Sequence, residues 1–339
     1  MTVGRARTGA LAAAGIVLLA LGGAGPWLAP SDPLHSIDSA ALRLLPPGTV
    51  VPALIRSDGK QLPVAGRDSD RPGTLITEWR AEGDDVVYRR GPRWKSVPLE
   101  ELQRDEAGRP RVIRLAFPLG TDRLGRDLLS RLLTGARLSL GIGIFGVAGA
   151  TLLGGLIGLV AGLGGRLSDA VLGRIGDSIL SVPRIVLVMA LAVLIRPGPW
   201  VLALLLAVSG WPSLARLVRA DVRSLSGSEM VASARAAGAE RWRVAFRHVL
   251  PHALTTLVVA AGLRVGPFIL LEGSLSFLGF GVPPPHPSWG NILGEGRDVL
   301  IDGWWITAVP GLLLGLTVVV VNAAADGLRD LMEPRRRPA

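Results

Sequence analysis

Residues 226–251 read SGSEMVASARAAGAERWRVAFRHVLP. This basic, amphipathic stretch lies between two apolar runs, 199–217 and 252–272, and each run is about as long as a bilayer crossing requires. A membrane protein with this much water-compatible sequence between two spans has either a helix lying at the lipid headgroups or a segment that holds a soluble partner. The residues alone leave both interpretations open.

The composition of the whole chain indicates a polytopic membrane protein. Of its 339 residues, 49% are hydrophobic, and the mean hydropathy is +0.43. Six apolar segments have about the length of a span, namely 9–29, 138–163, 177–195, 199–217, 252–272 and 304–325. The predicted fold class is therefore an all-α membrane protein with about six transmembrane helices. Frequent glycine in the second segment predicts that this helix packs inside the bundle.

The net charge of +10 does not indicate nucleic-acid binding, because the basic residues punctuate apolar runs instead of lining one soluble face. Arginines gather before the first segment, between the second and third, over 216–247 and after the last. Arginine-rich short loops face the cytoplasm, so this alternation predicts that both termini are cytoplasmic. The first apolar run continues through Ala29, which favours a retained membrane anchor over a cleaved signal peptide.

Residues 31–116 form a different kind of sequence, polar and close to neutral, and the predicted topology places them outside the membrane. Strand-like pieces at Thr49–Arg56, Leu75–Arg80 and Val86–Arg90 are separated by turn signals. We predict a small β-rich extracytoplasmic insert; a poorly ordered loop is the alternative, because Pro and Gly are dense. The predicted domains are 1–30 (cytoplasmic tail and first helix), 31–116 (insert), 117–334 (transmembrane core) and 335–339 (cytoplasmic tail).

The chain offers little for metal or nucleotide chemistry. It has no Cys and four His, and the two His that are four residues apart, His248 and His252, have Pro251 between them and no acidic partner. A metal site is not predicted. No Gly-rich loop ends in Gly-Lys-Ser or Gly-Lys-Thr, and the two lysines, Lys60 and Lys95, both lie in the insert. We therefore expect no cofactor in this chain and no catalytic residues.

The segment 226–251 contains signals for two short helices. Ser226 and Glu229 have the spacing of a capping box, which predicts a helix beginning near Gly227. Gly238 would end that helix in a left-handed conformation, and a second helix would start at about Ala239. The apolar face of this second helix would consist of Trp242, Ala245, Phe246 and Val249.

This segment resembles the EAA loop of permease subunits of bacterial ATP-binding-cassette (ABC) importers. The family pattern is Glu-Ala-Ala, three residues, Gly, then an apolar residue followed by Leu-Pro, and it falls on Ala232, Ser233, Ala234, Gly238, Val249, Leu250 and Pro251. The chain departs from the pattern where Ala232 and Ser233 replace Glu and Ala. Two further stretches, FPLGTDRLGRDLLSRLLTGARLSL at 117–140 and SLSFLGFGVPPPHPSWGNIL at 274–293, are similar to the dipeptide, oligopeptide and nickel permeases, specifically to the dipeptide C subunit.

The resemblance implies the type I importer permease architecture in a bacterial inner membrane. It implies half of a transport path shared with a second, similar permease, one or two cytoplasmic ATPases that carry ATP and Mg, and an extracytoplasmic solute-binding protein. It also implies that the loop 218–251 couples the ATPase to the spans. The candidate coupling residues are Ser233, Ala234, Arg235, Gly238, Ala239, Trp242, Leu250 and Pro251. Di- or oligopeptides are the expected substrates, with nickel or other small solutes as the alternative.

Two further groups of residues are candidate sites. Arg264 lies near the middle of the segment 252–272, where charge is costly, and Glu272 could approach it. A structural ion pair and a role in lining the path stay open for these two residues. Thr121, Asp122, Arg126, Asp127 and Trp289 are candidates for an external interface with the partner permease or the binding protein. For the first four of these, the alternative is a capped external turn with exposed ion pairs, which contribute little to stability.

Two proteins of other classes would share some of these features. A membrane-anchored scaffold or sensor would use the insert as its working part, but six spans and three ordered motifs argue against it. A secondary transporter would need ion-coupling sites within this chain, and few acidic residues fall inside the spans.

Overall fold

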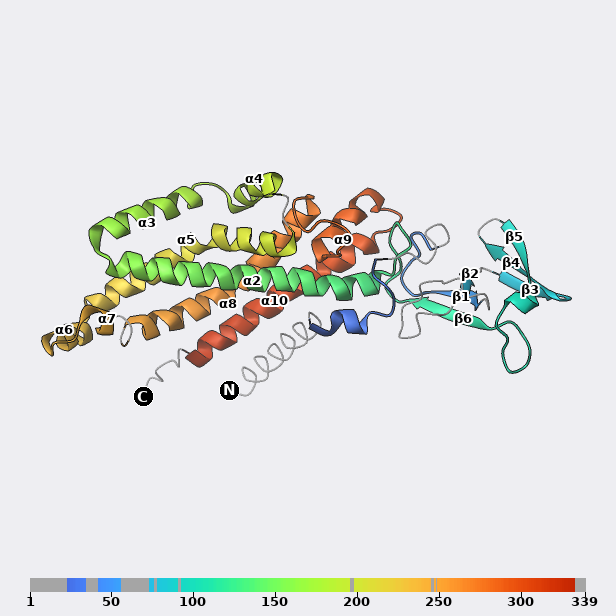
Figure 1. Ribbon diagram of the computed structural model, residues 1–339, viewed down its shortest axis with the longest axis horizontal. Helices are drawn as coiled ribbons and strands as arrows, with labels where there is room; N and C mark the ends of the chain where they lie inside the picture. Colours follow the sequence, from blue (N-terminus) through green and yellow to red (C-terminus); the bar gives the residue numbers. More distant parts are fainter. Residues whose placement is uncertain are drawn as a thin grey trace. The chain divides into compact units, whose positions relative to one another are not determined.

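The computed structural model describes residues 23–34, 42–55, 73–75, 78–90, 93–195, 198–244, 247 and 249–332 (Figure 1). The chain divides into two compact units. One unit contains residues 139–283 together with those from 313 onward, and it is helical. The other contains residues 20–138 and 284–312, and it carries all the described strands.

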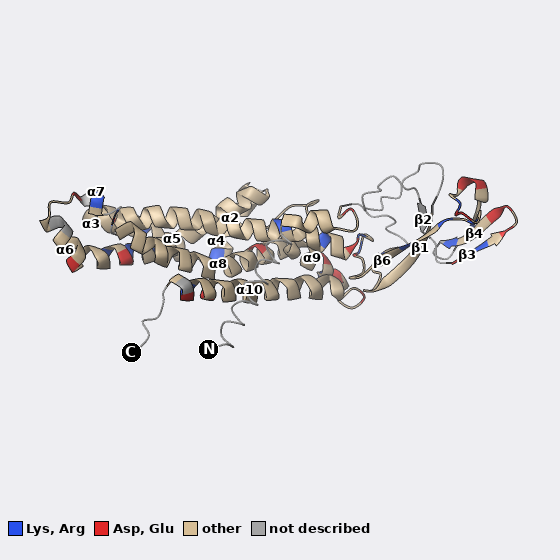
Figure 2. Ribbon diagram, turned by 90° about the horizontal axis from the view of Figure 1, so that it is seen from below, with Lys and Arg blue, Asp and Glu red and all other residues tan. Residues whose placement is uncertain are grey.

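Helices make up most of the described chain. In chain order they are α2 (Leu128–Leu163), α3 (Gly165–Leu180), α4 (Arg184–Ile195), α5 (Pro199–Ser226), α6 (Glu229–Ala236), α7 (Arg241–Val244), α8 (Leu250–Phe277), α9 (Trp289–Gly296), the 3-10 turn η3 (Arg297–Val299) and α10 (Trp305–Met332). Residues 23–28 are also helical. Charged residues are sparse along α2 and α8 and more frequent near the loop formed by α6 and α7 (Figure 2). The predicted all-α membrane class is confirmed.

Among the described residues, four helices are long and apolar enough to cross a membrane: α2, α5, α8 and α10. The pair α3 and α4 counts as a fifth span if it is taken together, but it is bent by 86°. The prediction of one continuous span over 177–195 was therefore wrong. Pro183 lacks a backbone donor and disfavours helix at the residue before it, so the chain breaks between the two helices. Most of the predicted first span, 9–29, lies outside the described residues.

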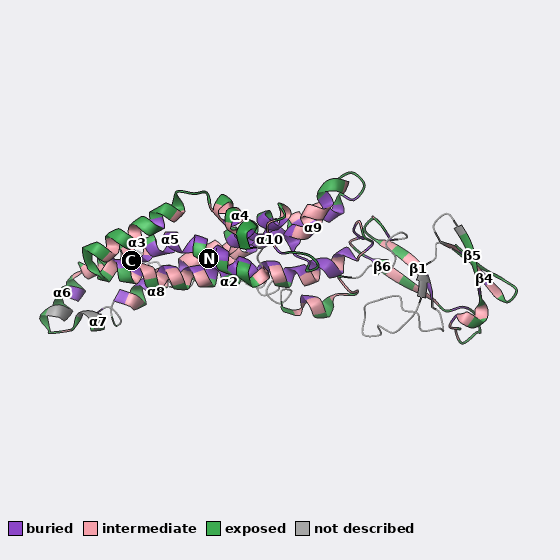
Figure 3. Ribbon diagram, turned by 45° about the horizontal axis from the view of Figure 1, so that its top comes forward, coloured by how far each residue is buried: buried purple, intermediate pink, exposed green. Residues whose placement is uncertain are grey.

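Helix α2 packs on α5 through small residues. A Cβ added at Gly154 would lie 2.6 Å from the Cβ of Leu214, and one added at Gly158 would lie 2.6 Å from the backbone oxygen of Ala215. Glycine at these positions lets the two backbones approach closely. The prediction of packing inside the bundle holds for this face only, because the opposite face is exposed at Phe145, Leu152 and Leu156. The most buried of the four spans is α5 (Figure 3).

The insert contains two small antiparallel sheets. In the first, β1 (Thr49–Ile55) lies between β2 (Gly73–Leu75) and β6 (Val112–Phe117). In the second, β3 (Glu78–Glu82), β4 (Asp85–Arg90) and β5 (Arg93–Pro98) follow one another, and the 3-10 turn η1 (Leu99–Glu101) comes next. Two clusters of buried apolar side chains form around these sheets: one contains Leu42, Ala53 and Phe117, and the other joins Leu54 of β1 to residues of β4 and β5. The β-rich character that we predicted is confirmed for the described part of the insert.

Candidate functional site

The first short helix of the predicted coupling loop, α6, begins later in the chain than the capping pattern indicated. Helix α5 continues to Ser226, and the hydroxyl of Ser226 donates to the backbone oxygen of Val222 at 2.6 Å. The cap of α6 is Ser228, whose hydroxyl accepts a hydrogen bond from the backbone nitrogen of Val231 at 3.4 Å. The predicted cap at Ser226 was wrong because α5 extends well beyond its apolar part into the arginine-rich sequence.

Between α6 and α7, Gly238 has a φ of +82°, which confirms the predicted left-handed turn. No heavy atom lies within 4 Å of a Cβ built at Gly238, so the conformation, and not space, requires glycine here. Ser233 and Gly238 are exposed, and Ala239 is partly buried. The loop therefore presents its turn on the surface of the helical unit.

The second half of the loop is described only in part. Residues 245, 246 and 248, and the side chains of Ala234, Arg235 and Trp242, lie outside the described residues. Val249, which we placed on the apolar face of the second helix, is buried within the chain. Leu250 begins α8 and Pro251 stands in its first turn, a position where the missing backbone donor costs nothing. The predicted apolar segment 252–272 therefore lies entirely within α8.

Ion pairs that were not predicted from the sequence connect α3 to the C-terminal part of α5. Asp169 forms ion pairs with both Arg219 and Arg223, and Oδ1 of Asp177 lies 2.7 Å from Nη2 of Arg216. The three arginines are spaced by three and four residues, which places them on one face of α5. The spacing of these arginines in the sequence could have indicated a charged helix face. These contacts attach the amphipathic α3 to the helix that leads directly into the loop.

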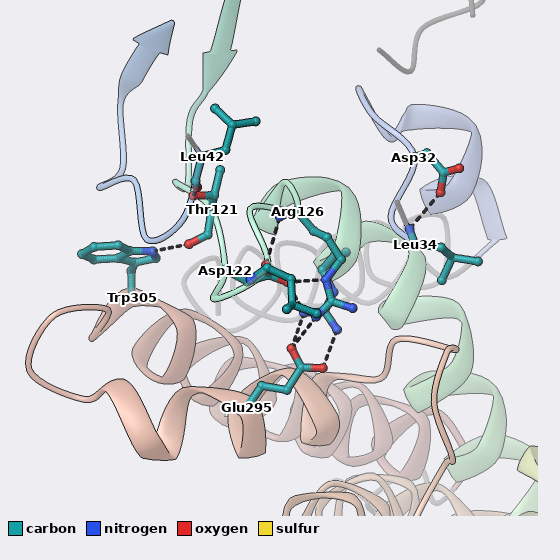
Figure 4. A network of polar contacts seen from close by, with 10 residues as sticks. Asp32, Leu34, Leu42, Thr121, Asp122, Arg126, Glu295 and Trp305 are labelled. Atoms are coloured by element: carbon teal, nitrogen blue, oxygen red, sulfur yellow. Dashed lines mark hydrogen bonds and ion pairs between the residues drawn. The ribbon is translucent and has the colours of Figure 1, made fainter. Parts of the chain in front are cut away.

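A buried ion cluster lies just before and within the first turn of α2 (Figure 4). Asp122 is fully buried, and its Oδ2 accepts hydrogen bonds from Nε of Arg126 and Nη1 of Arg131, both at 2.6 Å. Its Oδ1 accepts from the backbone nitrogens of Leu124 at 2.8 Å and Arg126 at 2.9 Å. One carboxylate thus closes a turn and holds two guanidinium groups.

Glu295 of α9 supplies the second carboxylate of the cluster. Its Oε2 accepts from Nη2 of Arg126 at 2.8 Å and from Nη1 of Arg131 at 2.5 Å, and its Oε1 accepts from Nη2 of Arg131 at 2.9 Å. Two arginines are shared between two carboxylates, so the four charges cancel. The ion pairs that we expected to be exposed are largely buried, because α9 folds back over the turn and leaves Arg131 only 2% exposed.

The remaining interface candidates also make their contacts within the chain. The hydroxyl of Thr121 donates to the backbone oxygen of Leu42, and Nε1 of Trp305 donates to the backbone oxygen of Thr121 at 3.1 Å (Figure 4). Asp127 accepts from Ser130. Nε1 of Trp289 donates to the backbone oxygen of Leu132 at 3.0 Å, and this indole is buried. These side chains organise the turn itself, and a contact with another protein stays a prediction.

Arg264 has a different partner from the one we expected. Its Nη1 donates to the hydroxyl of Ser213 on α5 at 2.5 Å. Glu272 is fully buried, and its Oε1 accepts from the hydroxyl of Ser276 at 2.7 Å. Eight residues along one helix correspond to a rise of about 12 Å, which separates these two positions by more than two turns. Arg184, which was not among the predicted site residues, lies near Arg264 in the same unit.

Comparison with known proteins gives consistent matches. Residues 154–338 match the family described as the binding-protein-dependent transport system inner membrane component. A peptide permease protein of Brucella suis biovar 1 is 42% identical over 218 residues, which cover 64% of this chain and 72% of that protein. DppC, the di/tripeptide transport system permease protein of Pseudomonas aeruginosa, is 40% identical over 223 residues, which cover 66% of this chain and 74% of DppC. Among solved structures, a chain of the inward-facing MetNI methionine ABC transporter matches 58% of this chain and 94% of its own length, with a TM-score of 0.48 and 18% identity.

Proposed function

This chain belongs to the family of inner membrane components of binding-protein-dependent transport systems, and we propose that within such a system it transports di- or oligopeptides. As a member of this family it is a transporter subunit and not an enzyme. The observation that carries the substrate proposal is the 40% identity to a di/tripeptide permease over 74% of that protein's length. Both relatives are named for peptides, and nothing observed favours nickel or a sensor.

The loop 218–251 is proposed as the contact with the ATPase. Three features support this role. The loop carries an exposed left-handed turn at Gly238. It is continuous with α5, the most buried span. In addition, α3 is attached to the base of the loop by Asp169 and Asp177. A displacement of the loop would therefore move α5 and α3 as packed bodies, because close-packed elements shift as units and do not deform continuously.

The assembly that we propose follows from family membership. An ATPase and an external binding protein are partners of the family in general. The finer proposal is that a second, similar permease completes the transport path, that ATP and Mg are bound by the ATPase subunits, and that both chain termini are cytoplasmic. The arginines of the loop support this orientation, since arginine-rich short loops stay on the cytoplasmic side. Residues 117–334 would then be the core, with the insert 31–116 outside.

Uptake measurements in the host, with and without this gene, test the proposal. Deleting the gene is expected to abolish uptake of a labelled dipeptide, and the wild-type chain is expected to restore it only while the ATPase subunit is present. Loss of nickel uptake with dipeptide uptake intact would favour the nickel alternative. Uptake that survives loss of the ATPase but stops when the proton gradient is removed would indicate a secondary transporter. A deletion that changes neither dipeptide uptake nor nickel uptake would favour the hypothesis that the protein is a sensor.

A further inference from the structure

Two arginines from different helices come together inside the helical unit. Arg184 is the first residue of α4, directly after the break that follows α3. Its Cζ lies 5.2 Å from the ring centroid of Phe268 on α8. Arg264 lies one turn before Phe268 on the same helix and donates to Ser213 of α5 at 2.5 Å. Both arginines therefore lie within about one helical turn of Phe268, and their like charges interact unfavourably.

The aromatic ring that Arg184 contacts fits into space left by glycines of α2 and α5. Phe268 is fully buried. A Cβ added at Gly210 would lie 2.5 Å from Cζ of this ring, and one added at Gly146 would lie 3.1 Å from its Cδ1. The ring is therefore enclosed by α2 and α5, and its face is available to the Arg184 guanidinium. Arg184 and Arg264 are each only half-buried, so part of each side chain remains accessible.

The charges of this pair are not balanced within the described chain. Among the described residues, neither guanidinium forms an ion pair with a carboxylate; Arg264 contacts the Ser213 hydroxyl, and Arg184 contacts the face of the Phe268 ring. The ion cluster at Asp122 shows the opposite arrangement, with two arginines matched by two carboxylates. Cationic side chains within a span are costly and usually face a partner or an aqueous path. An anion that arrives during function would neutralise Arg184 and Arg264 without a resident carboxylate.

We propose that Arg184 and Arg264 form a two-arginine site that binds the carboxylate of the transported peptide as it passes through the permease. Guanidinium groups suit this task, because their planar donors match the two oxygens of a carboxylate and stay charged at any physiological pH. Ser213 orients one guanidinium and Phe268 the other. The inference rests on the proposed function, since it assigns the part of a peptide that this permease recognises.

The test uses the complete importer in proteoliposomes and compares a dipeptide with the same dipeptide amidated at its C-terminus. Calorimetry first establishes concentrations at which the binding protein is equally occupied by each peptide. The wild type is expected to transport the free carboxylate faster than the amide. In R184Q/R264Q, uptake of the carboxylate peptide should fall roughly 10- to 100-fold, the range that the loss of charged hydrogen bonds produces, whereas uptake of the amide should change little. R184K/R264K should keep part of the preference, because it retains both charges.

The outcomes separate this inference from the proposed function. If the wild type transports neither peptide, the proposed function fails and the inference fails with it. If the wild type transports peptide and R184Q/R264Q keeps the same ratio of carboxylate to amide uptake, the proposed function stands and the arginine site is overturned. An equal fall for both peptides also overturns it, because a structural role, or pairing with a carboxylate of the partner permease, would affect both alike. ATPase stimulation by the loaded binding protein reports that each variant is assembled.

Discussion

At the scale of single residues, Gly238 offers the sharpest test of coupling. Its φ of +82° would strain any residue with a side chain, by about 1–2 kcal/mol for the left-handed conformation. We expect Gly238→Val to remain in the membrane while ATP hydrolysis continues without uptake. The measurement is the ratio of peptide transported to ATP hydrolysed. The matched control is Gly227→Ala in the same loop, where φ is −91° and no close contact forms, so coupling should persist. Normal uptake in Gly238→Val would show that Gly238 is not required for coupling ATP hydrolysis to transport.

Asp122 tests how much the buried ion cluster contributes to stability. Asp122→Ala removes an acceptor shared by Arg126 and Arg131 and leaves these buried charges undercompensated, which costs about 3–5 kcal/mol. Asp298 is the control, because its ion pair with Arg123 is exposed at both side chains and is worth about 0–1 kcal/mol. Melting temperatures in detergent should therefore fall strongly for Asp122→Ala and hardly change for Asp298→Ala. Similar shifts in both variants would contradict the assigned role of burial.

At the scale of elements, the contact between α2 and α5 depends on which face each glycine occupies. Gly158→Ala would drive a methyl group to 2.6 Å from the backbone of Ala215, and the backbone cannot move away easily; overpacking of this kind costs about 1–3 kcal/mol. At Gly141 no atom lies within 4 Å, so Gly141→Ala should be neutral or stabilising by up to about 1 kcal/mol. The thermal stability of the purified chain is the measurement. The idea is contradicted if the two variants shift it in the same direction.

Some helices and turns could be predicted from the sequence, and others could not. Hydropathy located α2, α5, α8 and α10, because each span must bury its backbone in helix and expose apolar side chains to lipid. The turn at Gly238 was readable, because few other residues tolerate a positive φ. The extension of α5 to Ser226 has no apolar pattern, and the spacing of its arginines, which form ion pairs with α3, was the one signal that could have indicated it.

Contacts between distant segments were the least predictable part of the candidate sites. Arg131 and Glu295 are 164 residues apart, and no local spacing connects them. The sequence singled out Arg264 because it interrupts an apolar run, whereas Arg184 follows a proline at a helix start and resembles an ordinary flanking charge. Its proximity to Arg264 arises only when α4 is placed against α8. Bundle packing therefore decides which isolated charges become pairs.

At the level of the whole molecule, the insert has two parts. We call β1 and β6 with Leu42 the root, and β3, β4 and β5 with η1 the tip; side chains of β1 pack in both. Neighbouring residues of a strand face opposite sides. Ala53 packs in a cluster with Leu42 and Phe117, whereas Leu54 packs with the residues of β4 and β5. The root is attached to the turn before α2, because the hydroxyl of Thr121 bonds the backbones of Leu42 and Leu45.

This division allows the insert to be shortened while the pairing of β1 with β6 is kept, and the three-residue edge strand β2 is removed together with the tip. In the pairing of β1 with β6, Leu54 lies opposite Val112. Replacing residues 56–110 by Asn-Gly would therefore close Ile55 and Arg111 with a two-residue turn that suits the twist of a hairpin. Leu54→Thr is added, because removal of the tip uncovers that fully buried side chain. If the tip is not needed for transport, this variant should assemble and take up peptide, whereas deletion of 40–110 also removes the contacts to Thr121 and should lower the amount of folded protein.

Peptide uptake, ATPase stimulation by the loaded binding protein and protein amount in the membrane are measured together for the two shortened chains. Uptake retained by the Asn-Gly variant would place the transport function in the helical part and argue against a sensor that works through the tip. The Asn-Gly variant could instead be present in the membrane with a responsive ATPase and yet lose uptake. In that case the tip is needed for peptide transport, and the prediction that it is dispensable is wrong. If both shortened chains disappear from the membrane, the tip contributes to stability, and the separation into root and tip is contradicted, because the two cores would not be independent.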